Sequence, residues 1–133
     1  MTILLNKSKE SIEASEFLKN ENLFASSVHC SYYSCIQLMR HILFNIQNED
    51  ENTFDNGQNI NQAGSHNYLL SILTNDLKNH EIDIRTFRNQ FRNIKDLRKN
   101  ADYKQLVILE IDCNNAYNLA LKINRTLKNI YSI

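Results

Sequence analysis

The sequence predicts an all-α protein, an up-and-down bundle of about five helices. Its 133 residues include no proline and only two glycines, although tight turns need these residues and long helices exclude them. Apolar residues also recur at intervals of three and four along most of the chain, which is the period of an amphipathic helix. The length is typical of one domain, here residues 1–133, and large enough to fold without a metal or a disulfide.

The first two expected helices cover residues 6–20 and 23–47. The first carries Ser8, Ile12, Ser15 and Leu18 along one side. The second would be roughly 37 Å long at about 1.5 Å per residue. Its apolar stripe continues without a break through Val28, Tyr32, Cys35, Met39, Ile42 and Ile46.

Residues 48–64 interrupt this pattern. The segment NEDENTFDNGQNINQAG is polar and acidic and contains both glycines. We therefore expect a long loop, which is a kind of segment that is usually functional or disordered, and its composition favours disorder.

Three further helices are expected after this loop. Ser65 is a candidate N-cap for the third, whose apolar stripe begins at His66 and continues through leucines to Leu77. The fourth covers about residues 83–100 and the fifth about residues 109–130, which again has apolar residues at four-three spacing.

The fourth helix places an arginine among its apolar residues. At ~100° per residue, with Ile84 at zero, Phe91 and Ile94 fall at roughly 340° and 280°, and Arg98 falls at roughly 320°. Asp102 lies one turn beyond Arg98. A buried guanidinium keeps its charge and needs a partner. Arg98 is therefore either half of a structural pair with Asp102, helped by Tyr103, or the anion-binding group of a cleft.

The same helix has a separate basic stripe. Residues 85–104 contain seven basic and two acidic residues, a net +5, within a chain of net charge zero. Aligned bases of this kind are either a solvated helix face or a contact surface for nucleic-acid phosphates. The candidate binding residues are Arg85, Arg88, Arg92, Lys95, Arg98 and Lys99.

Composition bounds the remaining functions. The three cysteines form no CxxC pair, so neither a disulfide framework nor a zinc site is predicted. No apolar run approaches the ~18 residues of a membrane span. We expect a cytoplasmic protein with no metal and no cofactor.

Three stretches of the chain resemble the HEPN domain family, in particular its small stand-alone prokaryotic branch. These are residues 6–39, with Ser31, Tyr32 and Tyr33, the segment SHNYLLSIL from residue 65, and LRKNADY at 97–103, which is similar to that branch's Arg-x-x-x-Asp-Tyr signature. The resemblance implies a helical bundle that forms a homodimer. It also implies an RNA- or nucleotide-binding role, with a small nucleotidyltransferase as partner in a toxin–antitoxin pair.

Many members of that family are metal-independent endoribonucleases whose active site is an Arg followed four to six residues later by a His. Arg98 matches, but Asp102 and Tyr103 occupy the place of the His. The candidate catalytic residues are therefore Arg98, Asp102, Tyr103 and, from another helix, His66. Tyr33 is a candidate cleft residue, whereas His29, His41 and His80 carry no comparable signal.

Three functions remain open. The first is an RNA- or nucleotide-binding module, the second is an active endoribonuclease, and the third is a structural helical module that binds protein. Binding to RNA that weakens steeply with salt would favour the first two over the third.

Overall fold

Every regular element is helical among residues 2–60 and 64–133, which are the residues described by the computed structural model. The all-α prediction is confirmed for these residues, with one helix more than the five expected. The six described α-helices are α1 (Ile3–Asn20), α2 (Phe24–His41), α3 (Glu51–Ile60), α4 (Ser65–Leu77), α5 (Ile84–Tyr103) and α6 (Glu110–Tyr131). A π-helical segment, η1 (Ile42–Ile46), continues α2.

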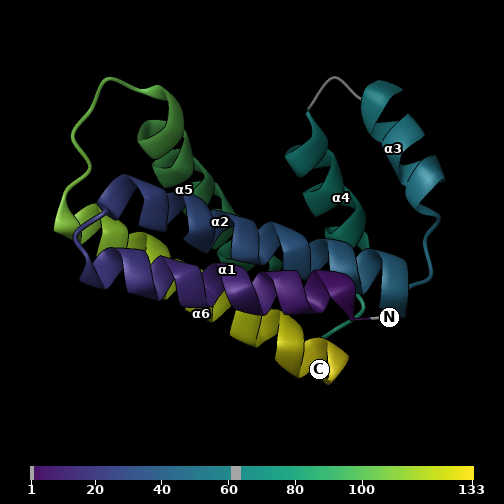
Figure 1. The fold of residues 1–133 in the computed structure, drawn as a ribbon. Helices are drawn as coiled ribbons and strands as arrows, with labels where there is room; N and C mark the ends of the chain where they lie inside the picture. Colours follow the sequence, from purple (N-terminus) through teal and green to yellow (C-terminus); the bar gives the residue numbers. More distant parts are fainter. Residues whose placement is uncertain (1, 61–63) are drawn as a thin grey trace.

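Helix α2 is the centre of the fold, since α1, α4, α5 and α6 all contact it. Helices α1 and α2 lie side by side across the molecule, and α6 crosses behind and below them (Figure 1). Helix α5 rises at one end of α2, and α3 and α4 rise at the other end (Figure 1). Above α2 the raised ends of α4 and α5 diverge (Figure 1).

Small hydroxyl side chains let α1 and α2 approach closely. Ser8 Oγ donates to the Ser34 carbonyl at 2.6 Å, and Ser27 Oγ donates to the Ser15 carbonyl at 2.7 Å. These four serines are buried, so each hydroxyl requires a partner. The remaining two hydroxyls also have one, because Ser15 Oγ donates to the Ser27 carbonyl at 3.0 Å and Ser34 Oγ to the Ser31 carbonyl at 2.7 Å. The side of the first helix that carries Ser8, Ile12, Ser15 and Leu18 thus faces the core, with the two serines buried and Ile12 and Leu18 half-buried.

The predicted apolar stripe of the second helix forms most of the core on α2. Val28, Tyr32, Cys35, Met39 and Ile42 are fully buried. The helix was expected to run unbroken to Gln47, and it continues to Ile46 with a change of hydrogen bonding. The Gln47 N–H donates to the Ile42 carbonyl at 2.9 Å, which is the i→i−5 bond of a π-helix.

The prediction of a loop over residues 48–64 is wrong for residues 51–60, which form α3. Asp50 caps this helix, because its Oδ1 accepts from the N–H groups of Asn52 at 2.7 Å and Thr53 at 3.2 Å. Phe54 is 3 % exposed and stacks on Tyr68 of α4, with ring centroids 5.2 Å apart. One cap and one buried ring thus anchor a polar helix. Residues 61–63 of the predicted loop lie outside the described residues.

The starts of the later helices are close to those expected. Asp83 caps α5 by accepting from the Thr86 N–H at 3.1 Å, and Leu109 precedes α6, with its N–H donating to Asp112 at 3.0 Å. The expectation for α4 was displaced by one residue. Gly64, with φ of 91°, is its N-cap, and Ser65 is its first residue.

Candidate anion site between α4 and α5

Arg98 lies in the interior, where its helical angle predicted it. Only 6 % of the residue is exposed, and it follows the buried Phe91 and Ile94 along the same face of α5. Its Nε atom is buried and has no hydrogen-bond partner. The guanidinium is therefore less completely paired than a purely structural buried arginine would be.

The other contacts of Arg98 are one ion pair, one hydrogen bond to a phenol and three aromatic rings, those of Tyr32, Tyr33 and Tyr103. Nη1 donates to Tyr103 Oη at 3.3 Å and lies 3.8 Å from Asp102 Oδ2, which is an ion-pair distance but too long for a hydrogen bond. Its Cζ lies 4.7 Å from the Tyr32 ring centroid and 5.8 Å from that of Tyr33. These are favourable cation–π distances, so aromatic rings supply part of the stabilisation that anions would otherwise provide.

His66 stands at the first turn of α4, beside this cluster. Its Nδ1 is hydrogen-bonded to Tyr32 Oη at 2.7 Å. Burial, together with the positive charges of Arg98, Lys95 and Arg40, lowers the pKa of His66 to about 4. His66 is therefore a neutral imidazole at pH 7, in a place where three cations converge on a helix N-terminus.

The basic stripe of α5 faces α4 at two points. Arg88 Nη2 donates to Thr74 Oγ1 at 3.4 Å, and Lys95 Nζ donates to Asn67 Oδ1 at 2.6 Å. Partial burial, Lys99 and Arg98 lower the pKa of Lys95, which is what crowding among like charges does. The stripe residues Arg85, Arg92 and Lys99 are exposed. The basic stripe therefore borders Arg98 at Lys95, and its other side chains extend into solvent.

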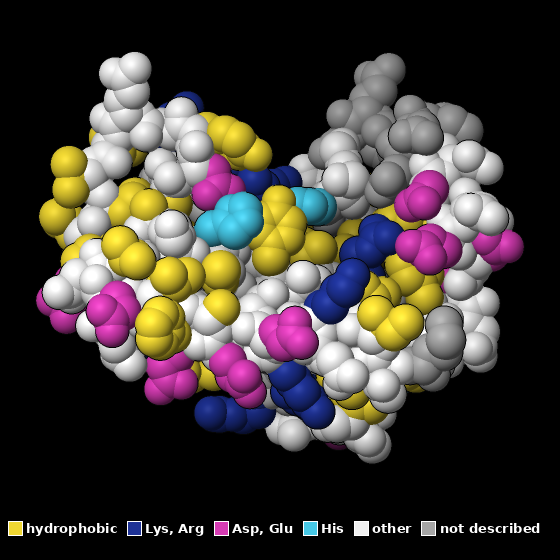
Figure 2. Space-filling view, viewed as in Figure 1, with side chains coloured by type: hydrophobic (Ala, Val, Ile, Leu, Met, Phe, Trp, Pro, Cys, Tyr) yellow, Lys and Arg dark blue, Asp and Glu magenta, His cyan; other side chains and the backbone are white. Residues whose placement is uncertain are grey.

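A notch separates the two raised parts of the molecule, and histidine, hydrophobic, basic and acidic side chains lie along its floor (Figure 2). On the α4 side of this region is a pocket of about 320 Å³ lined by Lys7, Tyr33, Arg40, Ser65 and His66, among others. Arg40 is also paired with Glu51 of α3 at 3.3 Å. The pocket therefore combines two basic side chains with the N-terminus of α4, which favours anions.

His29, which was not among the site residues predicted from the sequence, contacts Asp102 of the site. Its Nδ1 lies 2.9 Å from Asp102 Oδ2 and 3.0 Å from Oδ1. Its ring centroid is 4.6 Å from that of Tyr33. Residues 29 and 102 lie on different helices, so no local spacing in the sequence could have found this pair.

The structure brings together the four candidate catalytic residues, Arg98, Asp102, Tyr103 and His66, and the candidate cleft residue Tyr33. Arg98 contacts Asp102 and Tyr103 directly and reaches His66 through the Tyr32 ring. Arg85 lies 13 positions before Arg98 in the same helix, about 20 Å along the helix axis, so it belongs to the far end of the stripe rather than to the cluster.

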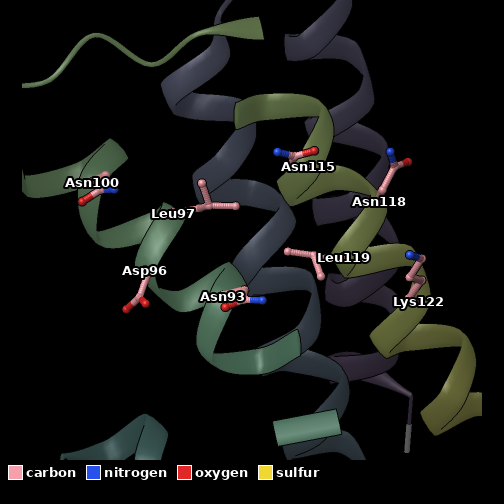
Figure 3. Close-up of a pocket in the computed structure, with 8 residues that line it drawn as sticks. All are labelled: Asn93, Asp96, Leu97, Asn100, Asn115, Asn118, Leu119 and Lys122. Atoms are coloured by element: carbon pink, nitrogen blue, oxygen red, sulfur yellow. The ribbon is translucent and has the colours of Figure 1, made fainter. Parts of the chain in front are cut away.

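A second groove, of about 530 Å³, lies between α5 and α6. Leu97 and Leu119 project between the two helices, with asparagines from both helices around them (Figure 3). Its charged residues are one acid and one base, Asp96 and Lys122. This groove therefore has no excess of positive charge and is distinct from the anion site.

No family model, curated protein or solved structure matches this chain. Within residues 2–60 and 64–133, no helix is both long enough and apolar enough to cross a membrane. In the same part of the chain, no three His, Cys, Asp or Glu side chains are grouped so that they could hold a metal ion. What the fold and the site define is an all-helical protein with a cationic, aromatic notch.

Proposed function

We propose that this protein binds the phosphates of RNA or of a nucleotide in the notch between α4 and α5. The observation that carries the proposal is the gathering of three cations around the N-terminus of α4. Arg98 lies over the ring of Tyr32, whose hydroxyl is bonded to His66. Lys95 donates to Asn67 of α4, and Arg40 lines the same pocket as Ser65 and His66. Positive charges brought this close repel one another, and an anion bound among them would relieve that repulsion.

Two further features favour a nucleic acid over a small inorganic anion. The basic stripe continues from Lys99 to Arg85 for about 21 Å along α5, which is long enough for several phosphates. Tyr33 and Tyr103 present aromatic rings beside Arg98, and bases stack on such rings without regard to sequence. The HEPN-like role expected from the sequence, including a nucleotidyltransferase partner, belongs to this proposal.

The test is the binding of a fluorescently labelled single-stranded RNA, measured by anisotropy across a salt series. We expect the affinity to fall steeply with salt, and Lys95→Gln to weaken binding and flatten the slope by about one charge. Arg98→Lys keeps the charge but loses the planar fork that grips phosphate, so it should also weaken binding. Lys122→Gln removes a cation from the separate groove of Figure 3 and is the matched control.

An RNA affinity that is absent at low salt, or that Arg98→Lys and Lys95→Gln leave unchanged, would refute the proposal. Adenine nucleotides titrated in the same assay distinguish the two ligand classes, because a mononucleotide reaches the cluster but not the length of the stripe.

A second candidate function, protein interaction, is favoured by one surface. The segment between α5 and α6 exposes large apolar side chains: Leu106 is 60 % exposed, Val107 84 %, Leu109 56 % and, at the start of α6, Ile111 64 %. A run of exposed apolar residues is typical of an interaction site. We propose that a second copy of the chain covers it, which is the homodimer expected from the sequence.

Sedimentation velocity tests the dimer. We expect a dimer at tens of micromolar that Val107→Lys converts to a monomer, while Lys122→Gln leaves it intact. A parent protein that stays monomeric would exclude the second copy, and the apolar segment would then be a surface for a different protein.

A further inference from the structure

Helix α3 is connected by an ion pair to the pocket on the α4 side of the notch. Glu51 Oε1 lies 3.3 Å from Nη2 of Arg40, and Arg40 lines this pocket of about 320 Å³. The Glu51 side chain is 63 % exposed, whereas that of Arg40 is 25 % exposed. An ion pair with so exposed a carboxylate contributes little to stability. Arg40 can therefore readily exchange this carboxylate for another anion.

Arg40 is positioned by aromatic rings as well as by Glu51. Its Cζ lies 4.9 Å from the ring centroid of Phe44 and 5.5 Å from that of Phe54, within cation–π range. The rings attract the guanidinium but do not neutralise its charge. The hydrogen bond to Glu51 uses one of its five N–H donors. The guanidinium thus has a restricted position and N–H donors with which to bind a second anion.

A second cation, Lys7 of α1, lines the same pocket. In the part of the chain that the structure describes, no acidic side chain forms an ion pair with Lys7. A phosphate group has three strong acceptor oxygens and can accept a bidentate bond from an arginine. One phosphate can therefore bind to Arg40 and Lys7 together, whereas the carboxylate of Glu51 is paired with Arg40 alone.

We propose that Arg40 and Lys7 bind one phosphate of the ligand in this pocket, and that Glu51 is a built-in competitor that holds Arg40 until the phosphate replaces it. This inference rests on the proposed function, because the phosphate belongs to the RNA or nucleotide bound in the notch. It gives α3 a regulatory role. The acidic helix weakens binding, and the bound phosphate breaks the ion pair between α3 and α2.

The charge of α3 and the contacts of its buried ring agree with this role. Residues 48–60 contain no basic residue and four acidic ones, Glu49, Asp50, Glu51 and Asp55, so a phosphate in the pocket repels the helix. Once the ion pair is broken, α3 keeps the packing of Phe54 against Phe44 and Tyr68, with ring centroids 5.5 and 5.2 Å away. Its amide hydrogens should then exchange faster with solvent, because local opening becomes easier.

Isothermal titration calorimetry with inorganic pyrophosphate at low salt tests the pocket, because this probe has neither base nor sugar. We expect the parent protein to bind it and Lys7→Gln to weaken binding by about ten-fold, as for the loss of one hydrogen bond to a charged group. Glu51→Gln removes the competitor and should tighten binding by up to about five-fold, the most that an exposed ion pair usually contributes. Pyrophosphate should also accelerate hydrogen exchange of α3 in the parent and change it little in Glu51→Gln.

Glu49→Gln is the matched control. It removes the same charge two positions away, from an exposed side chain that forms no ion pair within residues 2–60 and 64–133. It should tighten pyrophosphate binding less than Glu51→Gln does. In a background of Arg40→Gln, Glu51→Gln should have no effect, which a double-mutant cycle measures. Circular dichroism verifies that every variant remains helical.

Pyrophosphate that does not bind, or that binds equally well to the parent and to Glu51→Gln, would overturn this inference. An equal effect of Glu49→Gln and Glu51→Gln would also overturn it, because general charge and not competition for Arg40 would then be the cause. RNA binding that Arg98→Lys weakens and Lys7→Gln leaves unchanged would overturn the inference and leave the proposed function standing. Binding of pyrophosphate that responds to Lys7 and Glu51 as expected, without any binding of RNA or nucleotide, would refute the proposed function alone.

Discussion

Replacement of Arg98 by methionine tests whether the buried guanidinium stabilises the fold. The substitution keeps a long apolar stem and removes only the charged end. At 3.8 Å from Asp102 and an effective dielectric constant of ~20, the gross attraction is about 4 kcal/mol. Breaking a buried pair commonly costs 3–5 kcal/mol because the remaining charge loses its partner.

Two features of the site reduce that figure. Asp102 keeps both contacts with His29 after Arg98 is removed, so its charge is not left alone. Burial of the Arg98 Nε–H group without a hydrogen-bond partner also destabilises the parent protein. The methionine variant has no such group. We therefore expect Arg98→Met to lower the free energy of unfolding by about 2 kcal/mol, below the full cost of a broken buried pair.

Urea denaturation followed by circular dichroism measures this difference, provided that the m-value is unchanged. In a background of His29→Ala, which has no side-chain donor, Asp102 loses both partners, so the same Arg98→Met change should cost more than it does in the parent. A variant as stable as the parent, or more stable, would refute this reasoning. It would mean that desolvation of Arg98 outweighs its contacts, and that the arginine is retained for a ligand alone.

Four other outcomes are expected. The pKa of His66 is about 4 in the folded state, whereas that of a histidine in an unfolded chain is ~6.5. Between these pH values the unfolded chain binds more protons than the folded one. The free energy of unfolding should therefore fall as pH decreases from 6.5 to 4. Arg98→Met removes one cause and should raise the pKa of His66 in an NMR titration. Tyr131→Phe removes the hydrogen bond that the tyrosine hydroxyl donates to Asp76 Oδ2 at 2.6 Å. It should lower the free energy of unfolding, measured by urea denaturation, by about 1 kcal/mol. Burial raises the pKa of Cys35 to about 12, so this thiol should not react with iodoacetamide at pH 8 unless denaturant is added. Mass spectrometry of the treated protein should therefore find Cys30 modified first.

The helices that sequence analysis predicted well are those with a long repeated pattern. The stripe from Val28 to Ile42 supplies five fully buried residues, so the inward face of this helix could be read from the sequence. Arg98 was found in the same way, as an exception within a regular pattern. Periodicity is a local property of the chain, so one sequence is enough to read it.

Helix α3 was missed because almost nothing in it repeats. Among residues 51–57, whose side chains the structure describes, Phe54 is the one buried residue, and a single apolar residue defines no period. The start signal at Asp50 was present but resembled the acidic residues around it. The helix depends on stacking between Phe54 and Tyr68, a contact with α4 that exists only once both helices are placed.

The site residues that could be predicted are likewise those that lie close together in the sequence. Arg98, Asp102 and Tyr103 lie within two turns of one helix, so their proximity follows from sequence spacing. His29 is 73 positions from Asp102 and lies on an exposed position of α2, where an ordinary surface histidine would also lie. What distinguishes His29 is that α2 crosses the end of α5 at the level of Asp102, a consequence of the serine contacts and apolar stripe that fix α2 in the centre of the fold. The arginine could be predicted because it departs from the pattern of its own helix, whereas the histidine required knowledge of how two helices meet.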